Sequence, residues 1–118
     1  MDIIKKNREF QLIFEKGHSI QGKYLVVYFL RNSYGINRFG VCAGKKLGTA
    51  VRRNYAKRLL REAIRGVSFA EEGWDLLLVA KNPILKASFC SIIEEIEHIL
   101  FKVGLLALKK EGAAEDSR

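Results

Sequence analysis

The sequence predicts an α+β fold, a two-layer α-β sandwich with the element order α-β-β-α-β-α. Two observations indicate the strands and helices: β-branched and aromatic runs at 23–31 and 74–83, and apolar residues at helical spacing in 50–65 and 86–110. At 118 residues, with 48% apolar residues, the chain is long enough for one core and too short for two. We therefore expect a single domain over residues 1–118, with a frayed tail from about 111 to 118.

The first helix is expected at residues 8–16. Asn7 precedes it as a candidate N-cap, and Gly17 follows it as a candidate left-handed C-terminal residue. Phe10 and Phe14 lie on one face of this helix at a spacing of four residues. Two phenylalanines so placed are core residues by default, and they become candidates for binding only where that face is partly open.

Three strands are predicted from their composition. Residues 23–31 alternate, with Tyr24, Val26, Tyr28 and Leu30 on one face and Leu25, Val27 and Phe29 on the other. Residues 38–44 follow the short turn 32–37, which predicts an antiparallel neighbour of the first strand. The continuous apolar run at 74–83, ended by Pro83, predicts a buried central strand. A further short strand around 19–21 is an alternative.

The stretch from Gly44 to Arg65 holds most of the net positive charge. It contains eight basic residues and one acid, Glu62, for a net charge of +7, whereas the whole chain carries +8. Thr49 is a candidate N-cap and Gly66 a candidate stop for a helix from about residue 50 to 65. Rows at four-residue spacing predict a basic side (Arg53, Lys57, Arg61 and Arg65) and an apolar side (Val51, Tyr55, Leu59 and Ala63).

Such a basic row predicts a surface that binds a polyanion. Like charges at this spacing destabilise a helix by a few tenths of a kcal/mol per pair, and a merely solvated face usually mixes in acids. The turn at Gly44 resembles a phosphate-binding P-loop, but only three residues separate Gly40 from Gly44, and Lys46 stands where Ser or Thr would hold Mg²⁺. We therefore exclude nucleotide hydrolysis and keep phosphate binding at the helix N-terminus.

The remaining polar residues give no catalytic or metal site. Cys42 and Cys90 are far apart and are interpreted as buried free thiols, typical of a reducing cytoplasm. His18 and His98 have no partner that would make them catalytic, so we assign them structural roles. Without an apolar stretch of membrane-spanning length or a secretory signal, we expect a cytoplasmic protein with no membrane partner.

The motifs resemble those of one RNA-binding family, the protein subunit of bacterial ribonuclease P, over residues 4–108. The resemblance rests on KKNREFQLIFEKG, RFGVCAGKKLG, VRRNYAKRLLREAIR and WDLLLVAKNP. The family pattern is matched at Lys45, Lys46, Gly48, Ala50, Arg53, Asn54, Lys57, Arg58 and Arg61. Tyr55 departs from it, because the family has arginine there, so whether Tyr55 contacts RNA is left open.

The resemblance implies a function in tRNA processing. The partners would be the large catalytic RNA, which cleaves with Mg²⁺, and precursor tRNA, whose 5′ leader is removed; no DNA partner is implied. The protein would supply no catalytic residue and hold no tight cofactor or metal. The family also implies a left-handed β-α-β crossover, contrary to the usual rule.

Two groups of residues carry these implied contacts. Those expected to bind the catalytic RNA are Lys45, Lys46, Arg52, Arg53, Asn54, Lys57, Arg58, Arg61 and Arg65. Those expected in a cleft for the leader are Phe10, Phe14, Val26, Tyr28, Arg53, Asn54 and Lys57. The alternative is a ribosomal-type structural RNA-binding protein, which would need no aromatic cleft. A protein-only nuclease would need clustered carboxylates, and the basic helix has only Glu62.

Overall fold

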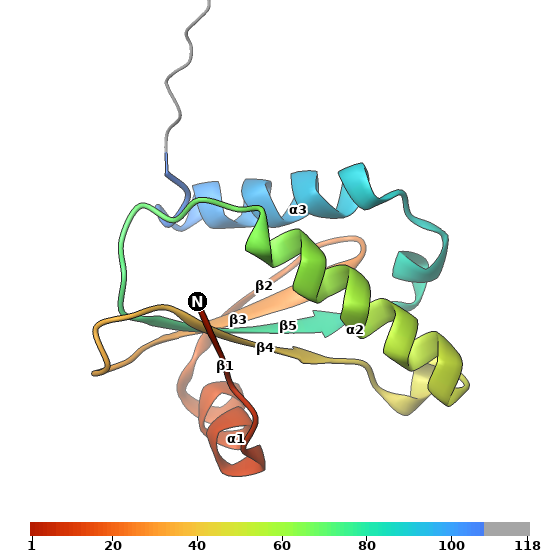
Figure 1. Ribbon diagram of the computed structural model, residues 1–118, viewed down its shortest axis with the longest axis horizontal. Coiled ribbons are helices and arrows are strands. Elements are labelled where there is room, and N and C mark those ends of the chain that lie inside the picture. Colours follow the sequence, from red (N-terminus) through yellow and green to blue (C-terminus); the bar gives the residue numbers. More distant parts are fainter. Residues whose placement is uncertain (108–118) are drawn as a thin grey trace, which may run out of the picture.

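The computed structural model describes residues 1–107, which form a five-stranded sheet in the order β1-β4-β5-β3-β2 with helices on both faces (Figure 1). The strands and helices are β1 Asp2–Ile3, α1 Asn7–Lys16, β2 His18–Gln21, β3 Leu25–Arg31, β4 Arg38–Cys42, α2 Ala50–Arg65, β5 Trp74–Ala80 and α3 Phe89–Lys102. Two short 3₁₀ helices, η1 Lys45–Leu47 and η2 Asn82–Lys86, precede α2 and α3. The expected frayed tail at 111–118 lies outside the described residues.

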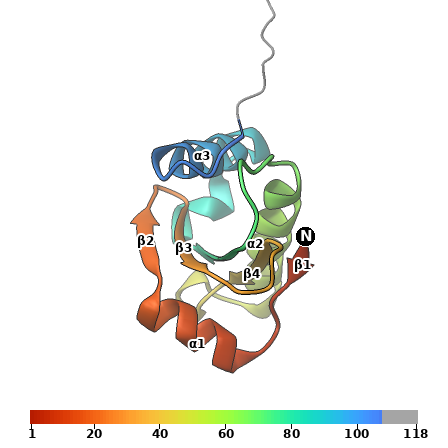
Figure 2. The same cartoon turned by 90° about the vertical axis from the view of Figure 1, so that its left-hand side faces the viewer.

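The mixed α+β class is confirmed, with a small addition to the predicted order. The alternative strand near 19–21 is present as β2, and the two-residue β1 was not predicted. Figure 2 shows α1 on one face of the sheet and α2 with α3 on the other. The sandwich of sheet and two helices is therefore extended by a single helix on the second face.

The predicted pairing of the strand at 38–44 with the strand at 23–31 is wrong. β5 lies between β3 and β4, antiparallel to β3 and parallel to β4. The connection 32–37 passes over the start of β5, where the Asn32 amide donates to the Gly73 carbonyl at 2.8 Å. Asn37, 1% exposed, accepts from the Trp74 amide at 2.9 Å. The segment 32–37 therefore connects β3 to β4 across the start of β5, which lies between them.

The parallel strands β4 and β5 are joined through α2 by a left-handed crossover. In the view of Figure 1, β4 lies in front of β5, both run from left to right, and α2 returns above them. Moving away from the viewer, the chain thus turns anticlockwise, which is the handedness that the family resemblance implied. The connection places the N-terminal end of α2 beside the C-terminal end of β4.

The alternation predicted for β3 is confirmed, and it divides the apolar residues into two cores. Leu25, Val27 and Phe29 are buried with α2 and α3 in a large cluster. The other face has a small cluster in which three residues are fully buried, Ile4, Ile13 and Leu77. Phe10, Tyr28, Leu30, Cys42 and Val79 pack against it while staying partly exposed.

The ends of α1 differ from the prediction. The N-cap is Lys6, without a side-chain hydrogen bond, and Asn7 is the first helical residue. Gly17 is extended, with φ −79° and ψ 162°, and not left-handed. Position 17 requires glycine for steric reasons instead, because a Cβ there would lie 2.6 Å from the Ile13 carbonyl oxygen.

Helix α2 has the predicted limits but a rotated apolar side. The Thr49 hydroxyl accepts from the Arg52 amide at 3.3 Å, which confirms the N-cap. Val51 is 78% exposed and Tyr55 38% exposed, so their assignment to the core-facing row is wrong. The buried residues are Ala56, Leu59, Leu60, Ala63 and Ile64. The first turn of α2 therefore extends past the residues that cover the sheet.

The last helix is shorter than the predicted span 86–110. It begins at Phe89, where the Ser88 hydroxyl accepts from the Ser91 amide at 3.1 Å, and it ends at Lys102. Gly104, with φ 79°, turns the chain away from the helix axis. Positions 108–110 of the prediction lie outside the described residues.

Candidate nucleic-acid interface

Three of the four cations in the row predicted on α2, Arg53, Lys57 and Arg65, lie on the β4 side of the helix, whereas Arg61 lines a hollow on its outer side. The Arg53 Nε donates to the Ala43 carbonyl at 3.0 Å, which holds this side chain at the end of β4. Lys57 is half-buried near Cys42, and the Arg65 guanidinium lies 5.9 Å from the centre of the Phe39 ring. Neighbouring backbone and rings thus position these cations along one edge of the molecule.

The other predicted RNA-binding residues spread over the outer side of α2 and the turn before it. Lys45 and Lys46 are exposed on η1, and Arg61 is half-buried. Arg52, Asn54 and Arg58 are also exposed. Within residues 1–107 the ion pairs are Arg31–Glu71, Arg38–Glu9 and Arg38–Asp75, and none of them involves α2 or η1. The charge of this surface is therefore left free for an external anion.

The aromatic residues predicted for the leader cleft lie together on the α1 face of the sheet. The rings of Phe14 and Tyr28 meet edge to face, with centroids 4.8 Å apart and an interplanar angle of 77°. Phe14 is 42% exposed. Phe10 lies over Gly40, where a Cβ would come within 2.6 Å of the Phe10 ring. Phe10 is thus partly core, whereas Phe14 presents an accessible ring.

Cys42 links this aromatic group to the basic helix. Its side chain packs against the same small core as Phe10 and Tyr28. Burial raises the pKa of the Cys42 thiol, and the positive charge of Lys57 acts in the opposite direction. Lys57 is therefore close enough to act electrostatically on a side chain of the α1 face of the sheet. Cys42 is a half-buried free thiol, but Cys90 is exposed, so the prediction that both are buried is wrong for Cys90.

Asn54 is placed differently from the rest of the predicted cleft residues. It lines a hollow of about 490 Å³ on the outer side of α2, together with Val51, Tyr55, Arg58 and Arg61. Val26, in contrast, is half-buried two residues before Tyr28 on β3 and pairs with Val79, which packs against the small core, so it lies on the same side of the sheet as Tyr28. The structure therefore brings the aromatic residues and Val26 together near Lys57, and Asn54 faces another surface.

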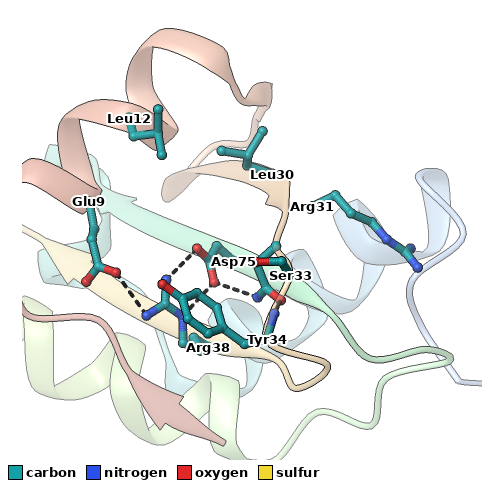
Figure 3. A pocket seen from close by; sticks show the side chains of 9 residues that line it. Glu9, Leu12, Leu30, Arg31, Ser33, Tyr34, Arg38 and Asp75 are labelled. Atoms are coloured by element: carbon teal, nitrogen blue, oxygen red, sulfur yellow. Dashed lines mark hydrogen bonds and ion pairs between the residues drawn. The ribbon is translucent and has the colours of Figure 1, made fainter.

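A buried ion-pair network beneath α1 was not predicted from the sequence. The Arg38 guanidinium donates to both oxygens of Asp75, at 2.9 and 2.7 Å, and to Glu9 at 3.0 Å (Figure 3). Asn32 donates to the same Asp75 carboxylate at 2.8 Å. The hydrogen bonds to Asp75 raise the pKa of Arg38, with a smaller effect from Glu9 and an opposing one from burial.

This network fixes α1 to the sheet. Glu9 belongs to α1, Arg38 to β4 and Asp75 to β5, so one guanidinium joins three elements. Tyr34 covers the guanidinium at 4.2 Å, and a hollow of about 430 Å³ lies beside it, lined also by Leu12 and Leu30. Local sequence patterns could not predict these ion pairs, because Glu9 and Asp75 lie 29 and 37 residues from Arg38.

Two kinds of feature are not found in residues 1–107. No group of three or more His, Cys, Asp or Glu side chains is arranged to hold a metal ion. None of the helices in this part has the length and apolar character needed to cross a membrane.

These features define a small basic α+β protein with a surface suited to nucleic acid. A family model described as Ribonuclease P matches residues 2–104. Proteins named "Ribonuclease P protein component" are 36% identical in Alkaliphilus oremlandii and 38% in Syntrophomonas wolfei, covering 87% and 88% of this chain and 91% and 88% of those proteins. The chain belongs to the ribonuclease P protein family.

Solved structures of bacterial family members share the fold. The Staphylococcus aureus RNase P protein superposes with a TM-score of 0.76 at 32% identity, over 91% of this chain and 99% of that one. The Thermotoga maritima RNase P protein gives a TM-score of 0.73 at 28% identity, over 86% and 97% of the two chains. Both the topology and the sequence therefore agree with the family.

Proposed function

We propose that this chain is the protein subunit of a ribonuclease P ribonucleoprotein. It binds the large catalytic RNA and the 5′ leader of precursor tRNA, and it assists the endonucleolytic cut that gives the mature 5′ end. The observation that carries the proposal is the pairing of two surfaces. One is formed by cations on α2 and η1 that make no ion pair with a carboxylate among residues 1–107, and the other by partly exposed aromatic rings on the adjacent sheet face. Membership in the family favours this function over a ribosomal-type structural role.

The cations act on the phosphates of the large RNA. Each Lys or Arg that neutralises a phosphate releases counterions, and this release drives binding in a salt-dependent way. Arg53 and Lys57 are held at the β4 end of the helix, so they can reach a strand that lies on the sheet face. The outer cations are left for the large RNA.

The aromatic face acts on the unpaired leader. Stacking of bases on aromatic rings contributes about 1–3 kcal/mol per base and tolerates sequence changes. Phe14 offers an accessible ring that Tyr28 supports from the side. A surface of this kind suits a protein that must accept the leaders of many precursor tRNAs.

The proposal assigns the chemistry to the RNA subunit and its Mg²⁺ ions. The protein alone should leave precursor tRNA intact, and adding the catalytic RNA should release the leader at a lower Mg²⁺ concentration than the RNA needs alone. Cleavage assays on 5′-labelled precursor, with protein, RNA and both together, measure this. Robust cleavage by the RNA-free protein would contradict the assignment.

Leader binding is tested with aromatic variants. Replacing Phe14 or Tyr28 by Ala should weaken binding of leader-bearing tRNA about tenfold, within the range for one stacked base, and leave mature tRNA binding unchanged. Phe101→Ala is the matched control, since Phe101 is 62% exposed on α3. Equal losses for both tRNAs would refute the leader site.

Phosphate contact is tested through the salt dependence of binding. Lys57→Ala and Arg61→Ala should each reduce the slope of log affinity against log salt by up to about one unit. Lys102→Ala, on the exposed end of α3, is the control for a change in net charge. A slope that falls equally in the control would point to general electrostatics instead of contact.

A further inference from the structure

An exposed apolar patch on α2 has no role in the fold, and its apolar residues take no part in the contacts described above. It consists of Val51 and Tyr55 from α2 and Leu85 from η2, with Arg52 and Lys86 at its border, and we name it the Tyr55 patch. These five residues line a hollow of about 440 Å³. Val51 is 78% exposed and Tyr55 38% exposed, so both present apolar area to solvent.

Tyr55 stands between this hollow and a second one. The second, of about 490 Å³, is lined by Asn54, Arg58 and Arg61 together with Val51 and Tyr55. The Arg58 guanidinium lies over the Tyr55 ring at 5.6 Å from its centre. The Tyr55 ring is therefore in contact with a cation in one hollow and accessible from the other.

The border of the patch is positively charged. Neither Arg52 nor Lys86 takes part in an ion pair among residues 1–107. Arg52 is held close to the backbone, because a Cβ at Gly48 would lie 3.2 Å from its Cδ. The nearest acid along α2 is Glu62, seven residues beyond Tyr55, about two turns of helix away.

We propose that the Tyr55 patch binds one unpaired nucleotide of the catalytic RNA. The base stacks on the Tyr55 ring between Val51 and Leu85, and the flanking phosphates contact Arg52 and Lys86. Charge complementarity favours RNA over a protein partner, since cations border an apolar area that fits a single base. The inference rests on the proposed function, because it names a contact with the same RNA.

The residue type at position 55 gives the proposal its sharpest consequence. The family pattern has arginine there, which would contribute an ionic contact, whereas a phenol contributes stacking without charge. The contribution of Tyr55 itself should therefore be insensitive to salt, whereas the phosphate contacts of Arg52 and Lys86 stay salt-dependent. Tyr55→Arg should restore an ionic contact and steepen the salt slope by about one unit.

The experiment measures binding of the full chain to the catalytic RNA transcript at several salt concentrations. Tyr55→Leu should weaken binding roughly tenfold with an unchanged salt slope, and Tyr55→Phe should bind like the parent protein. Lys86→Ala should reduce the slope. Ultraviolet cross-linking of the complex, read by mass spectrometry, should place a nucleotide adduct on the peptide that contains Tyr55.

Each outcome decides the proposal. Parental affinity in Tyr55→Leu, or adducts confined to other peptides, would overturn it and leave the patch to a protein contact. Thermal unfolding of Tyr55→Leu checks that the fold is kept, and Tyr55→Phe separates the ring from the hydroxyl. If the parent protein itself fails to bind the catalytic RNA, the proposed function fails; loss confined to Tyr55→Leu supports the patch.

Discussion

The two faces of the sheet are built in different ways. On the face covered by α2 and α3, apolar side chains from both helices and β3, β4 and β5 form one large buried cluster. On the α1 face, three residues are fully buried and several apolar neighbours stay partly exposed. The first face is complete within the protein. The second keeps aromatic and aliphatic area available for a ligand.

The helices on the two faces are also attached to the sheet by different interactions. The pair α2 and α3 is held by side-chain packing, since Leu60, Ile64, Ile96 and Leu100 have no exposed area. The single helix α1 has one fully buried core residue, Ile13, and adds the ion pairs of Arg38. Directional ion pairs fix the orientation of a helix that has little packing, so the rings of α1 can remain exposed and still be well placed. Four predictions test this contrast, and a fifth concerns a residue outside both faces.

The largest effect on stability is expected from the Arg38 network. Asp75→Ala leaves a guanidinium that is only 14% exposed without its main partner, and loss of one partner of a buried pair costs about 3–5 kcal/mol. Urea unfolding measures the free energy. Asp75→Asn, which keeps part of the hydrogen bonding, is the control and should lose less. A change below 1 kcal/mol in Asp75→Ala would contradict a stabilising role of the Arg38–Asp75 pair.

The second prediction separates stability from leader binding. Leu60→Ala removes a fully buried side chain from the large core and should lower the free energy of unfolding by about 3 kcal/mol. Phe14→Ala should lower it by less than about 1 kcal/mol, because Phe14 is 42% exposed. Leader affinity should change in the opposite way. Phe14→Ala should bind the leader more weakly than the parent protein, whereas the folded molecules of Leu60→Ala should bind it with nearly parental affinity. Equal stability losses would remove the distinction between the faces.

The third prediction concerns the link between α1 and the sheet. Glu9→Gln removes the charge that joins α1 to Arg38 and keeps the bidentate pair with Asp75. Stability should fall by about 1 kcal/mol, and leader binding should weaken while binding of mature tRNA is kept. Glu15→Gln, an exposed position on the same helix, controls for charge. A leader affinity equal to that of the parent would show that α1 needs no such ion pair.

The fourth prediction uses the two cysteines as reporters of the two faces. Cys42 lies on the α1 face and Cys90 on α3, where it is exposed. Because its pKa is raised by burial, Cys42 has less thiolate at a given pH and should be alkylated slowly near neutral pH, faster as the pH rises. Bound leader RNA should slow Cys42 alkylation further and leave Cys90 unaffected. Equal protection of both thiols would indicate non-specific coverage.

The smallest effect is expected at acid pH, on neither face. Hydrogen bonding from the Trp74 indole, and then from Arg31, lowers the pKa of the exposed Glu71 below its ordinary 4.5. Its contribution to stability is present above that ordinary value and is lost as the pH falls through the lower folded-state pKa. Glu71→Gln should lower stability by a small constant amount above pH 4.5 and should flatten the stability curve below it. A difference that varies with pH above neutrality would indicate a different role.

The sequence predicted the helix limits and the strand alternation that depend on neighbouring residues, because local sequence patterns reflect local interactions. The limits of α2 follow from Thr49 and Gly66, residues whose effect on a helix end is local. The alternation of β3 follows from its own sequence. In contrast, the neighbour of β4 is set by β5, more than thirty residues later, so a short turn gave the wrong pairing.

The candidate site was predicted unevenly for the same reason. The basic residues of α2 and the pair Phe10 and Phe14 each lie within one helix, so their spacing could be read from the sequence. The Arg38 network and the exposure of Tyr55 depend on segments that meet only in the folded chain. Val51 and Tyr55 match a helical apolar stripe, but the sheet ends before it reaches them, and the stripe moves to Ala56 and Ile64.

The place of β5 between β3 and β4 has a consequence for folding during synthesis. Its two neighbours, β3 and β4, do not pair with each other and lie one strand apart. A nascent chain that has not yet reached Trp74–Ala80 therefore exposes two unpaired strand edges, together with its basic helix. Completion of the sheet must wait for β5, which makes the slow, non-local pairing of this strand the step that commits the chain to its native topology.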